Sequence, residues 1–154
     1  MTVEATVRNL IHPRAVESPY VEMFRRLTAM MPFDFLICSE RSGSNLITKI
    51  LDAHPLVCGP FPSHMIRTLA FNINNYGDLS NERNWHTLLE DTANLLEHGI
   101  AKWKTRFSVD QLRREVRPHT LDALIRFVYE TEAQANAKQR VFVKENHSCL
   151  LYTS

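Results

Sequence analysis

The chain has 154 residues, of which 44% are hydrophobic and 23% are charged, and its formal net charge is +1 at pH 7. These values are typical of a globular protein with a single domain. The absence of a basic excess argues against nucleic acid as a partner, because such binding needs clustered positive charge. A small anionic molecule needs only local charge and remains compatible with the composition.

The chain contains three cysteines, Cys38, Cys58 and Cys149, and no C-x-x-C pair. An odd number without paired spacing argues against a disulfide framework or a zinc site and fits a reducing, cytoplasmic compartment. Cys38 and Cys58 end apolar runs, so both are predicted to be buried. No apolar run reaches the 18 residues of a membrane span, and the N-terminus lacks the apolar centre of a signal peptide.

Residues 1–32 form a mixed segment interrupted by Pro13 and Pro19. We expect this segment to be a lead-in that packs beside the first strand, and its sequence assigns it no role.

The next segment, residues 33–60, predicts a strand, a tight loop and a helix. The apolar run at 33–38, FDFLIC, is typical of a short buried strand. A polar turn follows at 39–45. Leu46, Ile47, Ile50 and Leu51 then recur on one face of a helix, and His54-Pro55 ends that helix because the residue before proline avoids the α region.

The loop between strand and helix has the composition of an anion-binding site. A helix N-terminus presents unpaired N–H groups and the positive end of the helix dipole. Gly43 permits close approach of a ligand to the backbone, and Arg41 adds a charged planar donor group. Ser42, Ser44 and Asn45 add short polar side chains.

The loop does not follow the Walker A pattern, G-x-x-x-x-G-K-[ST]. With Gly43 as the second glycine, Cys38, Ser44 and Asn45 occupy the other defining positions, so three of the four fail. The residues therefore favour phosphate binding without Mg-ATP chemistry. From geometry alone, an ordinary turn with polar surface residues stays equally open.

The helix is followed by a second predicted strand, 56–58, and a loop that opens with Gly59-Pro60. Ligands of open α/β sheets bind beyond the carboxyl ends of the strands. Phe61, Ser63 and His64 are therefore candidates for the acceptor side of a site, meaning the side that would hold a second ligand opposite the anion. A plain loop without a ligand is an equally valid interpretation. A helix is expected over residues 64–75.

Helical spacing predicts three further helices. They cover residues 85–100, a segment that begins at the capping box Ser108–Gln111 and ends before Pro118, and residues 121–138. We expect them to cover one side of the sheet. Between the first two lie Lys102, Lys104 and Arg106, interleaved with Trp103 and Phe107, which either contact a charged acceptor or form a solvated helix end.

Residues 140–147 predict a further strand, because Val141, Phe142 and Val143 are β-branched or aromatic. Lys144, Glu145 and His147 gather at its carboxyl end, where a site is expected.

The loop and the helix after it resemble the 5′-phosphosulfate-binding loop of PAPS-dependent sulfotransferases, in particular the bacterial-type branch. Arg41-Ser42-Gly43-Ser44-Asn45 matches the basic-Ser-Gly-Ser/Thr-small pattern, and residues 51–60, LDAHPLVCGP, match its continuation. Lys144 matches the lysine of a Lys-x-His-like signature, although Asn146 stands where many members have the histidine. The resemblance therefore leaves His147 or Glu145 as the base.

The resemblance implies an α/β fold with a P-loop-like parallel sheet flanked by helices. It implies sulfuryl transfer from PAPS, without a metal, to a hydroxyl or amine of a small-molecule, glycan or lipid acceptor. Arg41 to Asn45 would bind PAPS, and Arg41, Lys144 and either His147 or Glu145 would be catalytic. The alternatives are a nucleotide-dependent P-loop-like kinase and a non-catalytic phosphate-binding module. Neither the acceptor nor the oligomeric state is predicted.

The last six residues, Cys149–Ser154, resemble the translation of a transposon adapter used in sequencing libraries. We therefore expect residues 1–148 to be the N-terminal part of one sulfotransferase-like domain, with the sheet truncated on its C-terminal side. The strand Arg and helix Ser that bind the 3′-phosphate in that family are not identifiable. The chain by itself is expected to be inactive.

Overall fold

The computed structural model describes residues 30–39, 41–99 and 102–144. The chain divides into two units between Met30 and Met31, and every element described below belongs to the second unit. Most of the predicted lead-in lies outside the described residues, as do Glu145, His147 and the segment 149–154.

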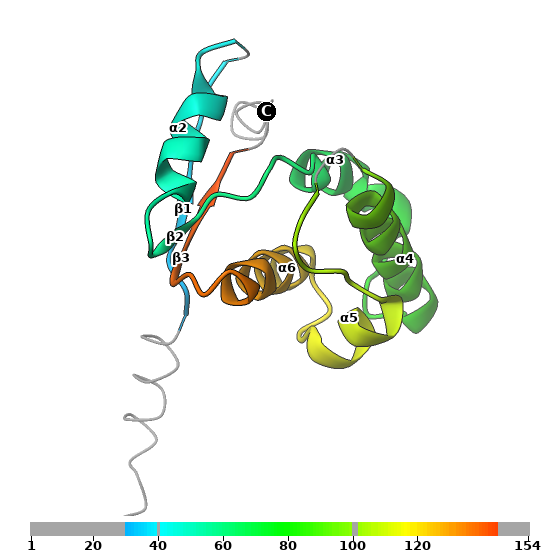
Figure 1. Cartoon of the computed structure of the whole chain (residues 1–154). Coiled ribbons are helices and arrows are strands. Elements are labelled where there is room, and N and C mark those ends of the chain that lie inside the picture. Colours follow the sequence, from blue (N-terminus) through cyan, green and yellow to red (C-terminus); the bar gives the residue numbers. More distant parts are fainter. Residues whose placement is uncertain (1–29, 40, 100–101, 145–154) are drawn as a thin grey trace, which may run out of the picture. The chain divides into compact units, whose positions relative to one another are not determined.

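The fold is α/β, with a three-stranded parallel sheet flanked by helices, as predicted (Figure 1). In chain order the elements are β1 (Phe33–Phe35), α2 (Ser44–Asp52), β2 (Val57–Cys58), α3 (Met65–Tyr76), α4 (Glu82–His98), α5 (Val109–Glu115), α6 (Leu121–Ala135) and β3 (Arg140–Val143). The strand order is β1-β3-β2, so the last strand in sequence is the central one.

Both outer strands pair with β3 in parallel. Phe33 is opposite Val141 in the β1 pairing, and Val57 is opposite Arg140 in the β2 pairing. The backbone N–H of Leu36, just after β1, still donates to the carbonyl oxygen of Val143 at 2.9 Å. The carboxyl ends of β1 and β3 therefore lie together at one edge of the sheet.

Helices lie on both faces of the sheet. Figure 1 shows α2 on one side of the strands and α6 on the other. The topology requires this, because the connections from β1 to β2 and from β2 to β3 run in opposite directions across the sheet and parallel crossovers keep one hand. The main core lies between α6, β3 and the α3–α5 helices, around the fully buried Trp85, Leu88 and Leu124.

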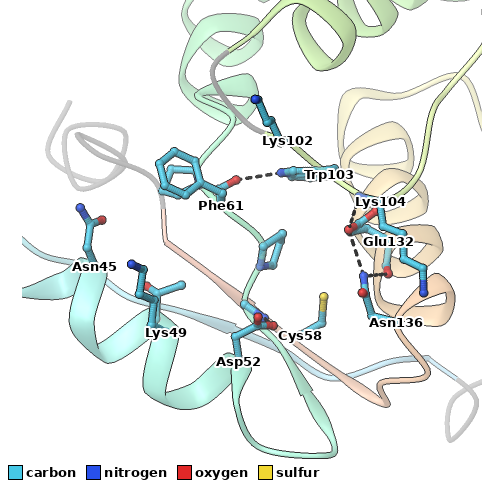
Figure 2. A pocket seen from close by; sticks show the side chains of 14 residues that line it. Asn45, Lys49, Asp52, Cys58, Phe61, Lys102, Trp103, Lys104, Glu132 and Asn136 are labelled. Carbon is cyan, nitrogen blue, oxygen red and sulfur yellow. Dashed lines mark hydrogen bonds between the residues drawn. The ribbon is translucent and has the colours of Figure 1, made fainter.

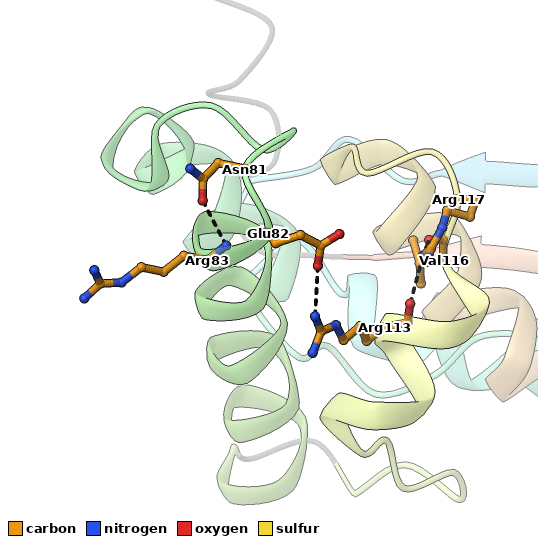
Figure 3. Close-up of polar contacts among 6 residues, drawn as sticks. All are labelled: Asn81, Glu82, Arg83, Arg113, Val116 and Arg117. Carbon is orange, nitrogen blue, oxygen red and sulfur yellow. Dashed lines mark hydrogen bonds and ion pairs between the residues drawn. The ribbon is translucent and has the colours of Figure 1, made fainter.

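Side-chain caps fix where three helices begin. Asn81, Ser108 and Thr120 each accept a hydrogen bond from a backbone N–H in the first turn of α4, α5 and α6, respectively. The helix start predicted from the capping box at Ser108 is thus confirmed. Figure 3 shows the Asn81 cap and an ion pair of 3.1 Å between Glu82 and Arg113, which links α4 to α5.

The prediction that residues 33–38 form a buried strand is wrong in two respects. The strand ends at Phe35, and the side chains of Phe35 and Ile37 are 49% and 60% exposed. The reason is the strand order, because within the described residues β1 pairs only with β3 and is an edge strand.

The apolar face of α2 is also not the buried one. Leu46 and Ile50 are 65% and 62% exposed, whereas Ser44 and Thr48 are buried. The hydroxyl of Thr48 donates to the carbonyl oxygen of Ser44 at 2.9 Å, so burial leaves this hydroxyl satisfied. A Cβ on Gly59 would lie only 3.0 Å from the Thr48 carbonyl oxygen. The polar face of α2 therefore packs closely on the chain that leaves β2.

Two predicted boundaries shift toward the N-terminus. The strand expected over 140–147 ends at Val143, and the helix expected to reach Lys138 ends at Ala135. Asn136 caps that helix, and Ala137 has a positive φ of 55°, a conformation that stops a helix.

A buried carboxylate anchors the segment between α4 and α5. Glu132 on α6 accepts hydrogen bonds from the backbone N–H groups of Lys104 and Thr105 at 2.9 and 2.8 Å. The side-chain amide of Asn136 donates to it at 3.0 Å. Only 4% of Glu132 is exposed. The carboxylate thus satisfies backbone donors that no helix or strand pairs.

We predict that Glu132→Gln lowers the free energy of unfolding by about 1–3 kcal/mol, because the amide places a donor where a buried N–H needs an acceptor. Urea denaturation followed by circular dichroism measures the loss. Glu115→Gln, an exposed position at the end of α5, is the matched control. Equal stability of the two variants would contradict the anchoring role of Glu132.

Candidate functional site

The loop before α2 has an unusual backbone. Arg41 and Gly43 both have positive φ angles, of 61° and 79°. A Cβ on Gly43 would meet nothing within 4 Å, so the glycine is required by its φ angle and not by lack of space. A non-glycine residue such as Arg41 adopts this conformation at a cost, and such strain often accompanies function.

The N-terminus of α2 retains unused donors. Gly43 is the N-cap residue, and no side chain caps the helix. Its carbonyl oxygen accepts from the N–H groups of Leu46 and Ile47. Within the described part of the chain, the N–H groups of Ser44 and Asn45 have no acceptor, and the first turn holds no acidic residue. This end of α2 can therefore receive an anion.

Lys144 reaches the loop from the central strand. It follows β3 directly and is only 3% exposed. Its Nζ donates a hydrogen bond of 2.9 Å to Oδ1 of Asn45, a residue 99 positions earlier in the chain. A lysine ammonium therefore lies next to the donor-rich end of α2.

The structure thus brings together part of the predicted site. Arg41 and Ser42 are exposed on the loop, and Asn45 contacts Lys144. Ser44 is buried on the face of α2 that meets the sheet. The two candidate bases, Glu145 and His147, lie outside the described residues, so their assignment stays a prediction.

A cavity of about 510 Å³ adjoins this loop (Figure 2). Its walls come from α2, the chain after β2, the segment before α5 and the end of α6. Fourteen residues line it: Asn45, Thr48, Lys49, Asp52, Cys58, Gly59, Pro60, Phe61, Pro62, Lys102, Trp103, Lys104, Glu132 and Asn136. The volume lies within the range of small-molecule sites.

One of the three residues proposed for the acceptor side lines this cavity. The ring of Phe61 faces it and is half exposed. Ser63 is instead buried, and its hydroxyl oxygen accepts from the N–H of Met65 at 3.2 Å. His64 is the N-cap residue of α3, with a positive φ of 58°.

Only some residues of the basic segment after α4 line the cavity. Lys102, Trp103 and Lys104 line the cavity. Arg106 lies outside it and pairs with Glu97 at 3.5 Å. Phe107 belongs to the buried core.

The sequence prediction missed the contribution of α2 to the cavity. Asn45, Thr48, Lys49 and Asp52 recur at the spacing of one helix face, which is the pattern that reveals a shared surface. Leu46, Ile47, Ile50 and Leu51, the residues by which the sequence predicts this helix, lie on the opposite face. The polar face of a helix that follows an anion-binding loop is the sequence signal that would have predicted this contribution to the cavity.

Cys58 lies in the cavity wall and is 2% exposed. Burial, with smaller contributions from the negative charges of Asp52 and Glu132, raises the pKa of its thiol to about 12. The predicted burial is confirmed for Cys58, whereas Cys38 is only half-buried.

Within the described ranges, no three His, Cys, Asp or Glu side chains are grouped so as to hold a metal ion. In the same part of the chain, none of the helices combines the length and the apolar character that crossing a membrane requires. Comparison with known protein families, characterised proteins and solved structures finds no match.

We predict that iodoacetamide alkylates Cys58 far more slowly than Cys38 in the folded protein. At pH 8 a thiol of pKa about 12 is ionised in roughly one molecule in ten thousand, and the thiolate is the nucleophile. The alkylation rate of Cys58 should therefore still rise about tenfold per pH unit between pH 8 and 10. Peptide mass spectrometry measures both sites, and a rate that levels off near pH 9 would contradict the raised pKa.

Proposed function

We propose that this chain belongs to a PAPS-dependent sulfotransferase and supplies its 5′-phosphosulfate-binding loop. The proposal joins the sequence resemblance at residues 41–45 to one structural observation. That observation is the buried Lys144 ammonium, which donates to Asn45 at the N-terminus of α2. A P-loop-like arrangement of the full sheet is part of the proposal.

The donor set at the loop fits a phosphosulfate group. Two backbone N–H groups, the guanidinium of Arg41 and the ammonium of Lys144 are all donors or cations. No acidic side chain lies in the first turn of α2 to compete with a bound anion. Charge-assisted hydrogen bonds of this kind are the strong ones.

PAPS, when bound, supplies a sulfuryl group: the S–O bond to its phosphate breaks as a new S–O bond to the acceptor oxygen forms, and the bridging oxygen leaves with PAP. Arg41 and the N–H groups of Ser44 and Asn45 hold the 5′-phosphate oxygens and stabilise the charge that develops on them. Lys144 neutralises the transferred group. His147 or Glu145 accepts the acceptor proton, a role that typically contributes about 10²–10⁴-fold.

We predict that, in a longer protein that contains this chain, Arg41→Ala weakens PAP binding by roughly ten- to a hundredfold, because it removes the loop's fixed cation. Arg41→Lys should be milder, since the charge remains although the planar donor group is lost. Isothermal titration calorimetry with PAP measures both.

The matched control is Arg83→Ala, because Arg83 is exposed and its side chain points away from α4 and α5 (Figure 3). Unchanged PAP affinity in Arg41→Ala would overturn the loop assignment. Turnover of Mg-ATP in place of PAPS would favour the kinase alternative. PAP binding without transfer to any acceptor would favour a phosphate-binding module.

We further predict that His147→Ala lowers turnover of PAPS while PAP affinity is nearly unchanged, because the base contacts the acceptor. The assay follows PAP release with a panel of hydroxyl and amine acceptors, using a longer protein that contains the chain. Glu145→Gln tests the competing assignment. Loss of turnover in Glu145→Gln alone would transfer the base role to Glu145.

A further inference from the structure

We infer that the cavity beside the loop binds the acceptor, and that this acceptor combines a flat ring with an acidic group. The inference rests on the proposed sulfuryl transfer and specifies the class of its second substrate. Three features of the cavity carry it: a fixed aromatic wall, two lysines that have no partner among the described residues, and a residue that the cavity shares with the loop.

The aromatic wall is held in place by the protein itself. Nε1 of Trp103 donates a hydrogen bond of 2.8 Å to the carbonyl oxygen of Phe61, across 42 residues of sequence. The indole also packs edge-on against Tyr129, with ring centroids 4.9 Å apart. Figure 2 shows this bond joining the two sides of the cavity. A wall that is rigid before binding gains affinity for a flat ligand, because little ordering remains to be done.

Most charged side chains of the cavity already make hydrogen bonds within the protein. Asp52 accepts from the N–H of Gly59 at 2.9 Å, and Glu132 accepts from two backbone N–H groups. Nζ of Lys104 donates to the carbonyl oxygen of Ala135 at 2.5 Å.

Lys49 and Lys102 remain. Among the described residues, neither ammonium has a hydrogen bond or an ion pair, and both residues are exposed at the cavity. They lie on different walls, α2 and the segment before α5 (Figure 2). The lining holds three lysines, Lys49, Lys102 and Lys104, against the two carboxylates of Asp52 and Glu132, so its positive charges exceed its negative ones. The cavity therefore prefers an anion, which the ammonium groups of Lys49 and Lys102 can approach.

Asn45 belongs to both the cavity and the loop. It lines the cavity, and its side chain accepts the hydrogen bond of Lys144. A ligand in the cavity therefore reaches the place where the sulfuryl group would be presented. Its acidic group meets the lysines while its hydroxyl faces Asn45.

The test compares two phenols of the same shape, 4-hydroxyphenylacetate and the neutral 4-hydroxyphenylacetamide. Isothermal titration calorimetry with the whole chain should show about five- to tenfold tighter binding of the anion, the effect expected of two partly exposed ion pairs. In the double variant Lys49→Gln/Lys102→Gln this preference should vanish while the affinity for the amide stays the same.

Arg106→Gln is the matched control, because Arg106 lies in the same segment but outside the cavity lining. It should keep the preference for the anion. Thermal melts of all variants establish that they fold. Equal affinity for both phenols in the unaltered chain, or a preference that survives in the double variant, would overturn the inference.

PAP titrations separate this inference from the proposed function. A chain that binds PAP but neither phenol keeps the sulfotransferase proposal and loses the acceptor site. A chain that binds the anionic phenol in a lysine-dependent way but not PAP keeps the cavity as an anion site and loses its role as the acceptor site of a sulfotransferase.

Discussion

The central position of β3 is the constraint on which the rest of the structure depends. β1 and β2 are joined by only 21 residues, yet they do not pair with each other, because β3 lies between them. The sheet therefore closes only when a strand from the far end of the described chain inserts between them. Long-range pairing of this kind makes folding slow, but it brings Lys144 beside Asn45, and with it the carboxyl end of the sheet beside the loop.

The sequence predicted the order and type of the elements well, because their signals are local. Turn residues, capping side chains and proline positions each act within a few residues, and Ser108 begins α5 as its capping box indicated. Burial was predicted less well, because it depends on partners distant in the chain. Phe35 looks like a core residue, yet it is half exposed on a strand that, among the described residues, pairs on one side only.

The candidate site also has a part with a local sequence signal and a part that depends on residues distant in the chain. The loop at 41–45 is a continuous motif and could be found from sequence, and so could Lys144, the residue that directly follows the predicted strand. The cavity is built from four segments that are separate in the sequence. No local sequence pattern predicts that Glu132 on α6 holds the segment that carries Lys102 and Trp103. Only the polar periodicity of α2 was visible beforehand.

The hydrogen bond between Lys144 and Asn45 also sets the terms of binding. In the protein alone, this ammonium already has an acceptor, so a ligand oxygen that takes its place exchanges one bond for another and gains only the difference. Competition of this kind favours an ionic oxygen over a neutral one, since only the former makes the stronger, charge-assisted bond on both sides. The amide of Asn45 therefore competes with any ligand oxygen that would replace it, and weak hydrogen-bond acceptors lose that competition. Without a ligand, the same amide solvates the buried charge of Lys144.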